Sequence, residues 1–79
     1  MASTHMNITS KIGLKIKLLR NKLGLSQEEL AEKSNLSSTS IGSIERGKSH
    51  PSIETLERIA IALGIELKEL VDVSKIDLD

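Results

Sequence analysis

The sequence contains no cysteine, no phenylalanine, tyrosine or tryptophan, and a single proline. Without cysteine the chain has neither disulfides nor thiolate metal ligands, and nothing in it requires an oxidising compartment. Without aromatic rings it lacks the platforms on which unpaired bases stack, which argues against single-stranded nucleic acid as its main ligand. The core must therefore be built from leucine, isoleucine, valine and alanine.

Long apolar runs are also absent. The longest extend over only a few residues, whereas roughly 20 are needed to span a bilayer, so we expect a cytoplasmic protein with no membrane contact. A chain of 79 residues has room for one small domain. We expect that domain over residues 8–73. Residues 1–7 resemble a cloning remnant without the apolar stretch of a signal peptide, and residues 74–79 are expected to be a frayed tail.

The chain has no net charge, with 11 basic and 11 acidic residues, but the charges are unevenly distributed. Residues 11–48 carry eight basic and four acidic side chains, and residues 49–79 carry three basic and seven acidic ones. The first part is thus suited to face phosphates, and the second to face solvent or a partner. Solvated faces with a chance asymmetry are the alternative explanation.

Helical spacing of apolar residues predicts an all-α fold, since no segment alternates with the period of two that a strand shows. Ser26 followed by Glu29 has the spacing of a capping box at the start of a helix, and Ser37 and Ser52 are further N-cap candidates. The predicted helices cover about residues 10–23, 27–33, 38–46, 53–63 and 66–73.

The second and third predicted helices have the features of a helix-turn-helix. Ala31 supplies a small residue where the helices meet, and Asn35 tolerates the left-handed conformation of the turn. The residues expected to face the interior are Leu30, Leu36, Ile41 and Ile44. The residues then expected to point outward from the third helix are Ser38, Thr39, Gly42, Ser43 and Arg46. Such a face can enter a major groove and hydrogen-bond to base edges, although an unselected polar surface is the alternative.

The segment LGLSQEELAEKSNLSSTSIGSIERGKSHPSIETLERIAIALGI, residues 23–65, resembles the Cro/C1-type helix-turn-helix family, also described as XRE or phage-repressor-like. The resemblance extends over about residues 12–70, with the motif itself at about 27–46. It implies a five-helix lambda-repressor-like domain whose third helix lies in the major groove of double-stranded DNA. It also implies a sequence-specific transcriptional regulator, and the short chain is similar to restriction-modification controller proteins and small phage repressors.

The resemblance implies which residues contact DNA. The matching positions are Gln27, Ser37, Ser38, Thr39, Ser43, Arg46 and Lys48. Ser38, Thr39 and Ser43 match base-contacting positions. Gln27, Arg46 and Lys48 match positions that contact the phosphate backbone. Ser37 is either near a phosphate or simply a cap, and Lys48 is as well explained as a solvated loop residue.

Two further features follow from the resemblance. Arg20 and Glu45 match a pair that commonly forms an ion pair between the first helix and the motif. The chain departs from the family at Asn35, where glycine is frequent, and in having only short side chains at the base-contacting positions. Bidentate recognition of adenine or guanine by glutamine or arginine is therefore excluded there, which gives DNA shape more weight.

Nothing in the sequence indicates catalysis, a metal or a cofactor. It has no cysteine nucleophile, no glycine-rich phosphate loop and no histidine pair at ligand spacing. The acidic cluster Glu28, Glu29 and Glu32 is expected to be solvated, with contact to RNA polymerase as the functional alternative.

We expect a homodimer, because one recognition helix makes few contacts and two are matched to a palindromic operator. The fourth and fifth helices are the expected interface. Its candidate residues are Ile61, Ile65, Leu67, Val71 and Val73, unless most of them belong to the core. A different class of function remains as an alternative, an antitoxin whose residues 71–79 fold on a toxin.

Overall fold

The computed structural model describes residues 6–76, and over this range the regular secondary structure is entirely helical. The helices are α1 (Ile8–Lys22), α2 (Gln27–Ser34), α3 (Ser38–Glu45), α4 (Ile53–Leu63) and α5 (Leu67–Val71). The predicted all-α fold of five helices is confirmed. Residues 1–5 and 77–79, which belong to the expected remnant and tail, lie outside the described range. Within residues 6–76 no helix is long and apolar enough to cross a membrane.

The helix boundaries follow the side chains that cap them. α1 begins two residues earlier than predicted, because the Asn7 carboxamide oxygen accepts a hydrogen bond from the Ser10 amide at 2.8 Å. The predicted capping box of α2 is present between Ser26 and Glu29. α5 is shorter than predicted, since Glu66 is its extended N-cap and the backbone becomes extended again at Asp72.

The core is aliphatic, as the absence of aromatic residues requires. Each helix contributes one fully buried large side chain, and these are Ile16, Leu30, Ile41, Ile59 and Leu70. Full burial of such a side chain contributes about 1.5–3 kcal/mol to stability. The apolar contacts of the fold therefore converge on one centre that all five helices share.

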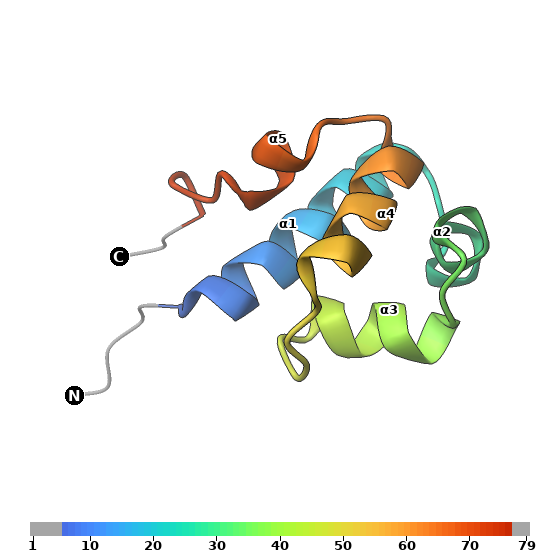
Figure 1. Ribbon diagram of the computed structural model, residues 1–79, viewed down its shortest axis with the longest axis horizontal. Coiled ribbons are helices and arrows are strands. Elements are labelled where there is room, and N and C mark those ends of the chain that lie inside the picture. Colours follow the sequence, from blue (N-terminus) through green and yellow to red (C-terminus); the bar gives the residue numbers. More distant parts are fainter. Residues whose placement is uncertain (1–5, 77–79) are drawn as a thin grey trace.

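The helices pack so that α3 lies at one edge of the molecule, at the bottom of Figure 1. α3 packs against α1 and α2, and α4 packs against α2. α5 packs against both α4 and α1. The α2–α3 turn contains Asn35 in the left-handed conformation, with φ 57° and ψ 45°. Arg58 of α4 donates hydrogen bonds to the carbonyl oxygens of Ser34 and Asn35, at 3.3 and 3.0 Å. The turn that orients α3 is thus held by α4.

Candidate nucleic-acid interface

The inner face of α3 is anchored by Ile41 and Ile44, which are buried as predicted. Leu36, just before the helix, is half-buried and packs against the core. One expectation is wrong: Gly42 does not lie on the outer surface but is buried. The ends of the Gln27 and Arg46 side chains lie close to its Cα and cover it.

A buried ion pair holds α3 against α1. Arg20 donates from Nε to Glu45 Oε2 at 2.6 Å and from Nη2 to Oε1 at 3.0 Å, and the two side chains are only 10% and 2% exposed. The hydrogen bond to the Glu45 carboxylate raises the pKa of the Arg20 guanidinium. The pair predicted from the resemblance is therefore confirmed, and it is bidentate.

Gln27 extends this ion pair to α2. Its Nε2 donates to Glu45 Oε1 at 3.0 Å, and Arg20 Nη1 donates to the Leu25 carbonyl oxygen at 2.8 Å, just before α2. One carboxylate therefore accepts hydrogen bonds from α1 and from the first residue of α2. This arrangement fixes the C-terminal end of α3 relative to the start of α2.

The other sequence-predicted residues lie along α3 and just after it. Thr39 is exposed, whereas Ser38 and Ser43 are half-buried. The Ser37 hydroxyl caps the helix, accepting from the Ser40 amide at 3.0 Å and donating to the Ser40 hydroxyl at 2.9 Å. Arg46 is the C-cap residue, and both it and Lys48 are exposed at that end of the helix. The structure thus brings all seven predicted residues to α3 and its two ends.

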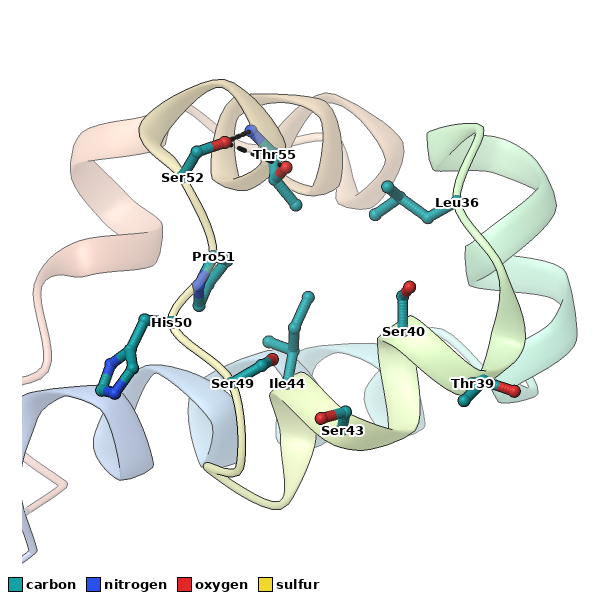
Figure 2. Close-up of a pocket in the computed structure, with 10 residues that line it drawn as sticks. All are labelled: Leu36, Thr39, Ser40, Ser43, Ile44, Ser49, His50, Pro51, Ser52 and Thr55. Carbon is teal, nitrogen blue, oxygen red and sulfur yellow. Dashed lines mark hydrogen bonds between the residues drawn. The ribbon is translucent and has the colours of Figure 1, made fainter.

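An open hollow of about 470 Å³ lies between α3 and the start of α4. Figure 2 shows the residues that line it. Ile44 points into the hollow from α3, and Leu36 points into it from the turn before α3. Pro51 lines the loop side. The hydroxyl groups around it belong to Thr39, Ser40, Ser43, Ser49, Ser52 and Thr55. Sequence reasoning assigned no interface role to Ser49 or Thr55, because their place beside α3 depends on how the loop packs.

The same loop is tied to the start of α1. His50 Nδ1 lies 3.0 Å from the Thr9 hydroxyl oxygen, a hydrogen bond between residues far apart in the chain. Among the described residues no group of three or more histidine, cysteine, aspartate or glutamate side chains is placed to hold a metal ion. The hydroxyl groups at this face can form hydrogen bonds, and the exposed Arg46 and Lys48 can pair with anions.

Of the apolar residues expected at a dimer interface, Ile61 is 71% exposed on α4. Val73, just after α5, is buried instead. Ile65, Leu67 and Val71 are half-buried and pack against the core. For Val73 the structure therefore favours the alternative, that this residue belongs to the core.

Two short helices joined by a left-handed turn, the second held at an edge with a polar outer side, define a helix-turn-helix protein. The helix-turn-helix family model matches residues 16–70. The chain belongs to this family, and the resemblance to its Cro/C1-type members is confirmed. With it the class of function is that of a DNA-binding transcriptional regulator.

The chain is similar to phage repressors and to control proteins. It is 45% identical over 60 residues to the immunity repressor protein of Bacillus phage phi105, covering 76% of this chain but only 42% of the repressor. It is 39% identical to the control protein C.BamHI of Bacillus amyloliquefaciens, covering 89% of this chain and 88% of that protein.

A solved structure of the restriction-modification controller protein C.AhdI from Aeromonas hydrophila superimposes with a TM-score of 0.77 and 40% identity. The match covers 78% of this chain and 94% of that one. Most of the controller protein therefore has a counterpart here, whereas the phage repressor extends well beyond the matched segment.

Proposed function

We propose that this chain is a controller-type regulator that binds a palindromic operator in double-stranded DNA as a homodimer, with α3 in the major groove. The observation that supports this most directly is the outer side of α3, where short hydroxyl side chains lie at an edge of the fold and the exposed cations Arg46 and Lys48 follow them. The similarity to C.BamHI and C.AhdI over most of their lengths favours the controller subtype over longer phage repressors.

In this proposal one group of residues contacts base edges and a second group contacts the phosphate backbone. Thr39 and Ser43, four residues apart, share one stripe of the helix and contact base edges, with Ser38 beside them. Gln27, Arg46 and Lys48 contact phosphates near the C-terminal end of α3, where the Gln27 side chain reaches Glu45. Ser37 contacts a phosphate only through its backbone or by giving up its cap, because its hydroxyl is already used within the helix.

The proposed dimer forms through α4 and α5, with the exposed Ile61 near its centre. Pairing doubles the DNA contacts and places two recognition helices about 34–36 Å apart, one turn of the duplex. The proposed location is the cytoplasm, where the DNA is. Glu28 and Glu32 are exposed on α2, and their contact with RNA polymerase stays a prediction.

The alternative function, an antitoxin that folds its C-terminal part on a toxin, has less support. Val71 packs against the core and Val73 is buried, so this part of the tail is already used by the fold. Residues 77–79 of that segment lie outside the described residues.

Selection of binding sites from a randomised duplex library at moderate salt tests the proposal. Enrichment of a palindrome with half-sites about one helical turn apart is expected. Half-sites without symmetry would contradict the dimer, and no enrichment over random duplex would contradict the regulator itself. Selection with an Arg46→Ala variant serves as the control, since loss of a phosphate contact weakens binding to all sequences and lowers its salt dependence.

A further inference from the structure

Gly42 lies in the middle of α3, where glycine is among the least favourable residues for a helix. Its φ is not positive, unlike that of Gly24, Gly47 and Gly64, so the backbone conformation does not require glycine. Position 42 therefore has glycine for a reason other than helix stability or backbone geometry.

The ends of two side chains border the space beside the Cα of Gly42. A methyl group on its Cα would lie 3.0 Å from Arg46 Nη1, 3.5 Å from Gln27 Oε1 and 3.7 Å from Gln27 Nε2. We call this space, bounded by Gly42, Gln27 and Arg46, the Gly42 gap. The first of these distances is tighter than most contacts of side-chain carbons, so a methyl group at position 42 would push the end of the Arg46 side chain away from Gln27 by a few tenths of an ångström.

The two side chains in the Gly42 gap differ in how they are held. Gln27 is fixed from behind, because one N–H of its carboxamide donates to Glu45, and Glu45 is paired with Arg20. The second N–H of the carboxamide is left for another acceptor. Arg46 is exposed, and within residues 6–76 no carboxylate pairs with its guanidinium.

We propose that Gly42 is a positioning residue, whose missing side chain lets Arg46 lie beside Gln27 so that both donate to one phosphate of a bound DNA strand. The inference rests on the proposed DNA binding and adds to it a shared phosphate site. Atoms of both side chains lie within 4 Å of a single point, and donors so close together are matched to two oxygens of the same phosphate. Charge-assisted hydrogen bonds of this kind are the stronger class.

The Gly42→Ala variant tests the role of the gap. Its melting temperature is expected to stay the same or rise, because alanine favours the helix. Its affinity for the selected operator is expected to fall roughly tenfold or more, as one charged hydrogen bond is lost. The slope of log affinity against log salt is expected to become shallower by about one.

A double-variant comparison separates positioning from a general defect. In an Arg46→Ala background, the change Gly42→Ala is expected to cause no further loss of affinity, because the side chain that it displaces is gone. An undiminished loss in that background, or full affinity of Gly42→Ala alone, would overturn the role assigned to Gly42.

A second measurement leaves Gly42 in place, so it does not depend on folding of that variant. Each operator phosphate is replaced in turn by an uncharged methylphosphonate, and binding is measured for the wild type, Gln27→Ala and Arg46→Ala. Both variants are expected to become insensitive to the same position in each half-site, and insensitivity at different positions would overturn the shared phosphate. If the wild type binds no duplex, the proposed function fails together with this inference. If the wild type binds but the two variants become insensitive at different phosphate positions, only this inference fails.

Discussion

At the scale of single residues, Glu45 connects α3 to both α1 and α2. Its carboxylate accepts two hydrogen bonds from Arg20 and one from Gln27, and its side chain is 2% exposed. A buried ion pair adds little to stability compared with well-packed apolar residues, but removing one partner leaves a buried charge unpaired. The pair therefore specifies where α3 sits more than it stabilises the fold.

Glu45→Ala is expected to lower the free energy of unfolding by about 3–5 kcal/mol, because Arg20 is left without its counter-ion. Chemical denaturation followed by circular dichroism measures the change. Replacing both partners, Arg20→Met with Glu45→Leu, is expected to recover most of the loss. A single variant within about 1 kcal/mol of the wild type would contradict the role of the pair.

Thr39 and Ser43 lie on one stripe of α3, and both line the hollow shown in Figure 2. If they contact bases, Thr39→Ala or Ser43→Ala changes the preference among operator sequences by about 1–3 kcal/mol per site. Competition binding between the selected operator and single-base variants measures this preference. Equal losses on specific and random DNA would instead assign these hydroxyls to the phosphate backbone.

Between elements, α1 approaches the C-terminal end of α3 closely at Gly13. A methyl group on Gly13 would overlap the carbonyl oxygen of Ile44 and lie 2.9 Å from that of Glu45. Those atoms are backbone and do not move aside as a flexible side chain does. The two helices can cross at this distance only because position 13 has no side chain.

Gly13→Ala is therefore expected to destabilise the protein by about 1–3 kcal/mol, since overpacking outweighs the gain in helix propensity. Thermal unfolding measures the effect. Gly42→Ala is the matched control, another glycine within a helix, but one whose neighbours are side-chain ends. Equal melting temperatures for the two variants would contradict the close crossing of α1 and α3.

The contribution of α2 to stability is expected to depend on pH, because a titratable carboxylate caps its start. The Glu29 carboxylate accepts a hydrogen bond from the Ser26 amide at 2.8 Å, and this backbone hydrogen bond lowers the pKa of Glu29 below its ordinary value. A carboxyl group whose pKa is lowered by folding stabilises the fold above its unfolded pKa. That contribution is lost as the pH falls through the lowered value.

Glu29→Gln is expected to flatten the decline in melting temperature between about pH 5 and pH 3, because the amide does not titrate. Glu28→Gln, in the same turn but outside the capping box, serves as the control. Identical pH profiles for Glu29→Gln and the wild type would show that the capping box contributes no pH dependence.

At the scale of the whole molecule, we expect two copies to pair through α4. Ile61 is 71% exposed on α4, so its contact with water is reduced if α4 forms the dimer interface. Ile61→Lys is expected to give monomers at concentrations where the wild type is dimeric, and to weaken binding to the palindrome. Analytical ultracentrifugation measures the first effect. Leu23→Lys, which replaces a 54% exposed leucine just after α1, is the control. A dimer unaffected by Ile61→Lys would exclude α4 as its centre.

Local patterns in the sequence were enough to predict the helices and the family. The fourth helix has the predicted bounds, 53–63, and the capping box at Ser26 and Glu29 is present. These features depend on residues three or four positions apart, so local spacing is sufficient to predict them. The family motif likewise identified the Arg20–Glu45 pair, although its members are 25 residues apart.

Which residues lie next to one another depends instead on how the helices and loops pack. Gly42 is buried under side chains from α2 and from its own helix, and Gly13 contacts a carbonyl oxygen of α3. Val73 packs into the fold, and Ser49 and Thr55 line a hollow beside α3. Each of these facts depends on contacts between segments distant in the chain. Helical periodicity predicts which side of a helix is apolar, but not what lies against each position.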